Sequence, residues 1–354
     1  MAIQIQVSNR LDAARFYLQE FVAPQADLVD RDWGALRSVL MGLGDRGLLA
    51  LRLEVTEEVF DSFQETVARY SGALAFLQTQ HQSAAAMVAS SSNELLKQDY
   101  LPHLATGGRL LGVGFSQLRR AGAPPVRARR VDAGYQIDGQ VPWVTGWGYF
   151  QEFIVGAMLP DGQAVFGIVP FAPIDRGKDG AIAFGEPMQL NAMTATNTVT
   201  ARLDRWFLPP ERVVSLKPTG WMEKQALENS LRHSFFPLGC ARAGLDILWE
   251  TAQRKQQRFM FEAFEALNIE LKDCRDRIFA RVRANEVSDN PIELRSRAID
   301  LAVRCAHAAV TVSRGAANYR HHRAGRVYRE ALAYTVFGQT TAVMEATLAR
   351  LVRA

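Results

Sequence analysis

Residues 134–159 read GYQIDGQVPWVTGWGYFQEFIVGAML, and this stretch decides the fold. Its first residues alternate in character, and Asp138-Gly139 is a strong two-residue signal for a hairpin turn. A second short strand follows through Trp143 and breaks at two nearby glycines, and further apolar runs occupy residues 153–158 and 164–169. The pattern predicts an antiparallel meander.

Trp143 and Thr145 alternate on the central strand of this meander, directly before the glycine break. Spacing alone favours a buried core position for Trp143, because short motifs of this kind often match by chance. The alternative is that both residues belong to a functional loop.

The stretch resembles the middle β-domain of the acyl-CoA dehydrogenase family. There a GYxLNGxKxWITN segment runs along the flavin, and its Trp and Thr contact the isoalloxazine ring. The matching residues here are Gly134, Tyr135, Asp138, Gly139, Trp143, Val144 and Thr145. The resemblance implies an α+β fold: an N-terminal α-helical domain (1–108), a middle antiparallel, barrel-like β-domain (109–216) and a C-terminal four-helix bundle (217–354).

Two flanking segments extend the resemblance. Residues 100–107, YLPHLATG, are similar to the family's exit from the helical domain, and the strand that follows ends in Phe115-Ser116. In the family this Ser or Thr bonds the flavin edge, where donors stabilise the charge of the reduced ring. The next loop departs from the family's EPxAGSD and is basic. Its arginines form either a solvated strand edge or an anionic substrate mouth: Arg119, Arg120, Arg127, Arg129 and Arg130.

The first hundred residues read as helices. Thr56 with two following acids is an expected helix start, and residues 73–87 are apolar almost all round, which indicates a buried helix. His81 interrupts that helix. A lone histidine there is more often a satisfied core residue than a catalyst, and both interpretations stay open.

From residue 223 onward the pattern is helical and favours an up-down bundle. Arg258 and Phe261 are similar to the family's RxxF, whose Arg crosses the dimer interface to the FAD pyrophosphate, and Gly315 falls in its glycine-rich turn. Residues 329–340 align without gaps with the family's RDAxxxxIYEGT. The alignment places Thr340 near the flavin, but the catalytic glutamate falls on Gly338 and the alternative base position on Asn229.

With both base positions empty, the resemblance leaves three functions open. The first is an FAD-dependent oxidoreductase acting on an acyl-CoA or related small substrate, with a base from elsewhere. The second is a flavin monooxygenase of the same fold, which needs no carboxylate there and for which His81 is a candidate. The third is a non-catalytic relative. The cofactor would be FAD, with FMN or an exchangeable reduced flavin as alternatives.

Composition excludes other classes. The chain has 354 residues, is 48% hydrophobic and carries a net charge of +4, which is too small and too dispersed for a nucleic-acid platform. Its three cysteines favour reduced, buried thiols, and no metal site is expected. Without a signal peptide or an apolar run of about 20 residues, a cytoplasmic protein is predicted. The resemblance implies a homodimer or homotetramer.

Overall fold

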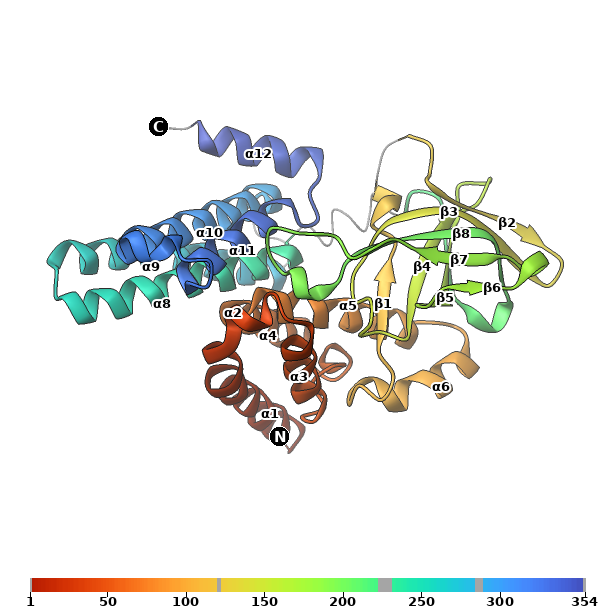
Figure 1. The fold of residues 1–354 in the computed structure, drawn as a ribbon, viewed down its shortest axis with the longest axis horizontal. Helices are drawn as coiled ribbons and strands as arrows, with labels where there is room; N and C mark the ends of the chain where they lie inside the picture. Colours follow the sequence, from red (N-terminus) through yellow and green to blue (C-terminus); the bar gives the residue numbers. More distant parts are fainter. Residues whose placement is uncertain (1, 120–121, 222–230, 284–288, 353–354) are drawn as a thin grey trace.

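The computed structural model describes residues 2–119, 122–221, 231–283 and 289–352. Figure 1 shows helices of the N-terminal part beneath the centre of the molecule, a sheet at one end and long C-terminal helices at the other. This order of helices, sheet and helices confirms the predicted fold class.

Four of the N-terminal helices, α3 to α6, begin at side-chain caps, in which an oxygen accepts a hydrogen bond from a backbone N–H of the first turn. The capping residues are Asp32, Thr56, Ser71 and Asn93. The main helices are α1 (Ala2–Tyr17), α2 (Ala26–Val29), α3 (Trp33–Gly44), α4 (Glu57–Tyr70), α5 (Gly72–Ala89) and α6 (Glu94–Leu104). Helix α5 contacts α4, strand β1 and helix α8, which explains why its sequence is apolar almost all round.

The nine strands form one sheet in the order β6-β7-β8-β3-β2-β4-β5-β9, with β1 paired to β4. The strands are β1 (Leu111–Gly114), β2 (Val126–Val131), β3 (Gly134–Val144), β4 (Glu152–Met158), β5 (Ala164–Pro170), β6 (Ile174–Asp175), β7 (Ala181–Phe184), β8 (Val199–Leu208) and β9 (Val213–Lys217). The prediction of an antiparallel domain holds for most pairs, but β1 and β2 run parallel to β4. Of the predicted meander only the antiparallel pairing of β4 with β5 is confirmed, because β3 pairs with β2 and β8 and not with β4.

The predicted hairpin turn at Asp138-Gly139 is wrong. Strand β3 runs straight through these residues, and the turn lies before it, where Ala133 has φ +61°. Asp138 instead accepts a 2.7 Å hydrogen bond from the N–H of Arg205 at a bulge between β3 and β8. Gly139 has φ +132°, and a Cβ there would collide with the carbonyl of Pro125 on the neighbouring strand. The glycine is therefore needed because two backbone segments approach closely. In the sequence, such a glycine looks the same as a turn signal.

The C-terminal helices are α8 (Phe235–Lys255), α9 (Arg258–Arg283), α10 (Pro291–Ser313), α11 (Arg323–Val336) and α12 (Thr341–Leu351). Helices α8 to α11 pack on one another as a bundle, and α12 packs on α10. Gly244 of α8 allows a close crossing, because a Cβ there would lie 2.6 Å from the backbone of Cys305 on α10. In the described residues no helix is both long enough and apolar enough to cross a bilayer.

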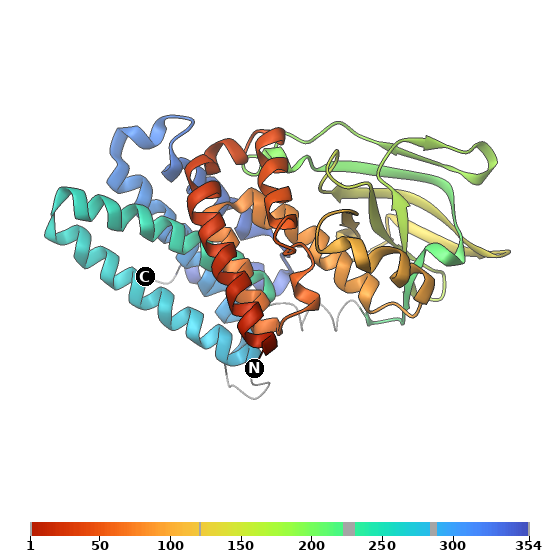
Figure 2. The same ribbon diagram turned by 90° about the horizontal axis from the view of Figure 1, so that it is seen from below.

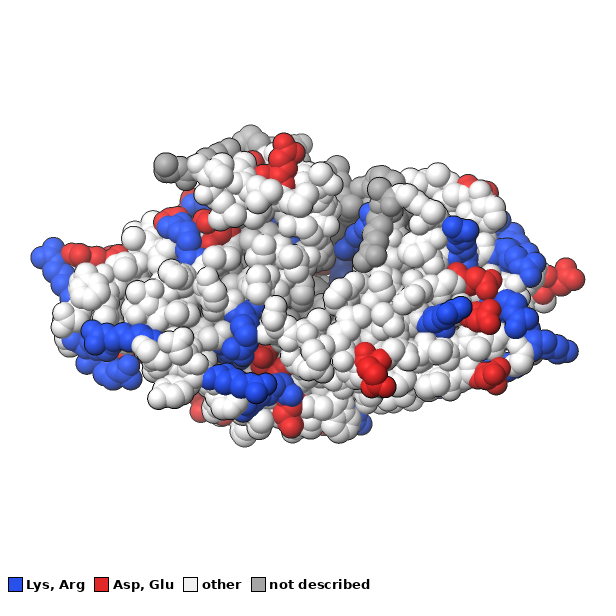
Figure 3. All heavy atoms as spheres, turned by 45° about the horizontal axis from the view of Figure 1, so that its top comes forward, with Lys and Arg blue, Asp and Glu red and all other residues white. Residues whose placement is uncertain are grey.

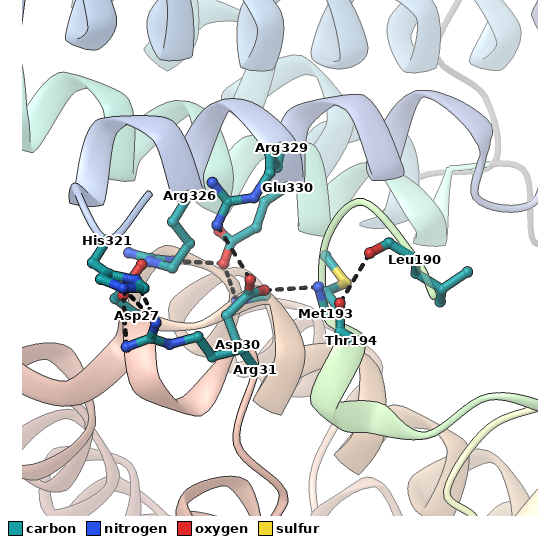
Figure 4. A network of polar contacts seen from close by, with 11 residues as sticks. Asp27, Asp30, Arg31, Leu190, Met193, Thr194, His321, Arg326, Arg329 and Glu330 are labelled. Carbon is teal, nitrogen blue, oxygen red and sulfur yellow. Dashed lines mark hydrogen bonds and ion pairs between the residues drawn. The ribbon is translucent and has the colours of Figure 1, made fainter. Parts of the chain in front are cut away.

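A buried polar network joins three distant segments (Figure 4). Glu330 of α11 pairs with Arg326 one turn earlier and accepts a 3.1 Å hydrogen bond from the N–H of Gly72, the first residue of α5. Asp30, which follows α2, accepts a 2.7 Å hydrogen bond from the N–H of Met193 in the loop before β8. Arg329 bonds Asp30 at 3.4 Å, so this network fixes the bundle, the N-terminal helices and the sheet to one another.

The three cysteines are buried and unpaired with one another, as predicted. Burial raises the pKa of Cys274 and of Cys305 to about 12, so neither forms a thiolate readily.

Candidate functional site

Trp143 stands out as a large aromatic residue that the sheet leaves uncovered. It lies on β3 where two residues, Pro142 and Trp143, face a single residue of β8, which is a β-bulge. Proline suits the bulge because it has no N–H to donate to the ladder. The side chain is 45% exposed, so the core position that spacing favours is wrong. Bulges are common next to active sites, where they re-aim a side chain, so the exposed indole is a candidate ligand contact.

The end of β1 lies beside this bulge. A Cβ on Gly114 would lie 3.1 Å from a methyl group of Val144, which shows how closely the two strand ends approach. Ser116 follows as an exposed residue in a short 3-10 turn, η4 (Ser116–Arg119), and Phe115 is half-buried with its ring 5.3 Å from that of Phe166. Trp143, Phe115 and Ser116 therefore share one end of the sheet.

Thr145 is buried at the same end of β3. Its hydroxyl lies 2.9 Å from the hydroxyl of Thr198, and either oxygen can be the donor. A hydroxyl has one hydrogen and two acceptor positions, so when Thr198 donates, the hydrogen of Thr145 stays available for a second partner.

Gly338 lies in the connection between α11 and α12 and packs against His233. Its φ is +54°, and a Cβ built on it would meet the imidazole at 2.8 Å from Cδ2 and 2.9 Å from Nε2. His233 belongs to the short 3-10 turn η8 (Arg232–Ser234) directly before α8 and is half-buried. Thr340 caps α12 through a 3.3 Å bond from the N–H of Val343.

Arg295 holds this connection from α10. Its side chain is almost fully buried, and its guanidinium donates to the carbonyl of Phe337, the residue before Gly338. Burial, followed by the positive charge of Arg119, lowers the pKa of Arg295 to about 10. Arg119 ends the turn η4, so this pair of arginines links the end of β1 to the Gly338 connection. Figure 3 shows basic side chains in a recess near the middle of the molecule.

Three other arginines of the predicted substrate mouth do not lie at the candidate site. Arg127, Arg129 and Arg130 are exposed on β2, where they bond Pro124, Gln136 and Asp161 respectively. These three form a solvated strand surface, and Arg120 lies outside the described residues. Of the basic residues singled out in the sequence, Arg119 is thus the one that approaches the candidate site.

His81 sits in the core and not in the site. It is fully buried, its Nε2 donates to the carbonyl of Leu104 at 3.0 Å, and its Nδ1 accepts from the N–H of Leu111 at 2.9 Å. Burial lowers the pKa of His81, so the ring stays neutral while it joins the end of α6 to the start of β1. This arrangement favours the core interpretation over the catalytic one.

Arg258, Phe261 and Gly315 gather at the opposite end of the bundle. Arg258 opens α9 with a side chain that is 92% exposed and pairs with Glu262. Lys255, at the end of α8, bonds the carbonyl of Val312 at 3.2 Å, which brings the turn after α10 and its Gly315 to this end. Helix α8 has 21 residues and spans about 30 Å, so within one chain these residues lie far from the start of α8 and His233. Figure 2, seen from below, shows the C-terminal helices and the sheet on opposite sides of the molecule.

Sequence reasoning missed His233 and Arg295. His233 is not one of the positions to which the resemblance assigns a role, Arg295 lies outside the motifs, and neither residue interrupts the apolar pattern in a way that signals a site. Asn229, the alternative base position, lies outside the described residues.

Next to His233, Arg232 pairs with Glu57 and approaches Asp61 of α4 at 3.8 Å. Asp61 is 2% exposed, and burial raises the pKa of its carboxyl to about 7 although Arg232 opposes the shift. The unfolded value is about 3.9, so between about pH 4 and pH 7 the native state binds more protons than the unfolded chain. The contribution of Asp61 to stability is therefore greatest at low pH and is lost as pH rises through 7.

We expect Asp61→Asn to raise the free energy of unfolding by about 1–3 kcal/mol at pH 8, because a buried amide carries no charge. At pH 5 the gain should be smaller. Urea denaturation at both pH values measures the difference, and Asp204→Asn, at a side chain that is 59% exposed, is the control. A gain of equal size at both pH values would contradict the assignment.

No protein-family model and no curated protein sequence matches this chain. Solved structures do match it. Butyryl-CoA dehydrogenase from Megasphaera elsdenii has a TM-score of 0.77 at 17% identity, over 98% of both chains. Glutaryl-CoA dehydrogenase from Mycobacterium smegmatis in complex with FADH2 has a TM-score of 0.79 at 17% identity, over 98% of this chain and 94% of that one. FkbI, for biosynthesis of a methoxymalonyl extender unit, has a TM-score of 0.74 at 20% identity, over 95% of this chain and 98% of that one. The chain therefore has the acyl-CoA dehydrogenase fold.

Proposed function

We propose that this chain is a flavin-dependent oxidoreductase that binds FAD with the isoalloxazine ring against Trp143. The observation that carries the proposal is the indole left 45% exposed at a bulge, at the sheet end where Ser116 also lies. The fold adds support, because one solved structure that shares it, a glutaryl-CoA dehydrogenase, is a complex with FADH2.

The residues at this end suit a planar, polar ring system. Trp143 offers a flat apolar face for stacking, which prefers offset contact between rings. Ser116 is exposed, and the hydroxyl of Thr145 can donate when Thr198 is the donor of their shared hydrogen bond, so both side chains suit heteroatoms at the ring edge. When bound, the flavin would supply the hydride transfer or oxygen chemistry that no side chain can perform.

The second set of predicted cofactor residues calls for a second copy of the chain. Arg258, Phe261 and Gly315 are separated from the start of α8 by about 30 Å of helix within one chain, so one cofactor cannot be expected to reach both sets in a monomer. Among the described residues Arg258 pairs with Glu262 on the surface, and its exposed side chain is available to a neighbouring copy. In the family that the sequence resembles, this arginine reaches FAD across a dimer interface.

For the reaction we favour oxidation of an acyl-CoA or a related small thioester. Gly338 carries no side chain, so the base comes from another residue. The absence of a carboxylate at 338 also favours the second candidate, a reduced-flavin monooxygenase, which needs no base at that position. His81 adds nothing to that candidate, because backbone groups occupy both of its ring nitrogens.

An absorbance spectrum of the purified protein, before and after addition of FAD, tests the proposal directly. We expect a bound-flavin spectrum that bleaches when butyryl-CoA or glutaryl-CoA is added without oxygen. A flavin that binds but stays oxidised with the thioesters would favour the monooxygenase. Absence of flavin binding would contradict both and leave the non-catalytic relative.

A further inference from the structure

The imidazole of His233 fills the space that a side chain at position 338 would need. The Cβ position of residue 338 lies 2.8 Å from Cδ2 and 2.9 Å from Nε2 of the ring. Gly338 has a left-handed backbone that glycine adopts without steric cost. The missing side chain and the imidazole are thus complementary, since any larger residue at 338 would displace the ring.

Both partners of this contact are held firmly. Phe337 packs its ring 4.5 Å from that of Phe76 on α5 and 5.3 Å from that of Tyr334, while Arg295 bonds its carbonyl. On the other side, the turn that carries His233 leads directly into α8 at Phe235, a fully buried residue. Side chains fixed in this way can act as a preorganised chemical site.

The residues that follow His233 and Gly338 in the chain each carry a buried polar atom without a partner in the described part of the chain. Ser234 follows His233, and Gln339 follows Gly338. The hydroxyl of Ser234 and the side-chain carbonyl oxygen of Gln339 are buried without a hydrogen-bond partner among the described residues. Buried polar groups are nearly always bonded, so each of these two atoms is available to a polar ligand.

We propose that His233 is the general base of the flavin-dependent reaction proposed above and that it takes a proton from the carbon next to the carbonyl of an acyl thioester. The C–H bond breaks, the proton passes to an imidazole nitrogen, and its electron pair becomes the new carbon–carbon π bond. When bound, oxidised flavin would supply the acceptor for the hydride that leaves the adjacent carbon as this π bond forms. The inference rests on the proposed function only for the hydride transfer to flavin, because the proton transfer to His233 does not involve the cofactor.

The surrounding charges suit this chemistry. Arg295 from α10 and Arg119 from η4 are close enough to repel each other, and both lie near the Gly338 connection. Negative charge that develops on the thioester oxygen as the proton leaves would be stabilised by such cations. Arg232, the neighbour of His233, is instead paired with Glu57 and Asp61 on α4.

Solvent-deuterium exchange tests the base separately from the flavin. The full-length wild type, His233→Gln and His233→Ala are incubated in D2O with butyryl-CoA or glutaryl-CoA, and mass spectrometry follows deuterium at the carbon next to the carbonyl. We expect wild-type exchange to fall at least about 100-fold in both variants, which is the usual contribution of general base catalysis. Added imidazole should restore exchange to His233→Ala, because glycine at 338 leaves the vacated space open.

The control is His307→Gln, at an exposed histidine of α10 whose ring lies 5.9 Å from that of Tyr328, and this variant should leave exchange unchanged. Thermal unfolding and the flavin spectrum are recorded for every variant. Exchange at the wild-type rate in a folded His233→Gln protein, or no exchange of either thioester by the wild type, would overturn the role of His233. Exchange that depends on His233 in a protein that binds no flavin would instead retain the base and remove the proposed oxidoreductase.

Discussion

Glu330→Ala is expected to lower the free energy of unfolding by about 3–5 kcal/mol, the usual cost of removing one partner of a buried ion pair. Arg326 is only 7% exposed at its side chain and Glu330 is fully buried, so the substitution leaves a guanidinium without a counter-charge in the core. It also removes the acceptor of the Gly72 N–H, which α5 needs at its first residue.

Two further variants separate charge from hydrogen bonding. Burial raises the pKa of Glu330, so the uncharged Glu330→Gln should cost less than alanine because its carbonyl still accepts from Gly72. The double variant Arg326→Met with Glu330→Gln should recover part of the loss, since no charge then remains buried.

The matched control is Glu262→Ala. Arg258 and Glu262 have the same i,i+4 spacing on α9, but their side chains are 92% and 59% exposed, so the expected cost is below about 0.5 kcal/mol. Chemical denaturation at pH 7, monitored by circular dichroism, measures the free energy of unfolding of both variants. If Glu330→Ala costs no more than Glu262→Ala, the network of Figure 4 does not hold the three segments together.

Sequence could predict the order of helices, sheet and bundle, because apolar periodicity and caps are local features. It could not predict the course of β3. Asp138-Gly139 has the same letters as a hairpin turn, and what decides against a turn is the approach of Pro125 from the neighbouring strand, a contact that no local pattern encodes.

The candidate site was likewise predictable from the sequence only in part. Trp143 and Ser116 follow from a motif, although only the structure reveals that a bulge exposes the indole. The contact between His233 and Gly338 joins residues about a hundred positions apart, so spacing carries no trace of it. The one available signal was the missing glutamate at 338, which implies that chemistry at that position, if retained, must come from a side chain elsewhere.

Trp143→Ala is expected to weaken FAD binding by about 5- to 150-fold, which corresponds to the 1–3 kcal/mol that stacking of a flat heterocycle on an aromatic side chain contributes. Because the indole is 45% exposed and stands at a bulge, the substitution should leave the melting temperature of the flavin-free protein nearly unchanged. A large effect on binding with a small effect on stability distinguishes a ligand contact from a core residue.

Titration of flavin fluorescence measures the affinity. Trp143→Phe retains a stacking face and should lose much less than alanine, whereas Leu95→Ala, at an apolar residue of α6 that is 72% exposed, should lose nothing. Unchanged affinity in Trp143→Ala would move the flavin ring away from the bulge, and a marked drop in melting temperature would return Trp143 to a structural role. Since the proposed function rests on this one exposed indole, no other single substitution tests it as directly.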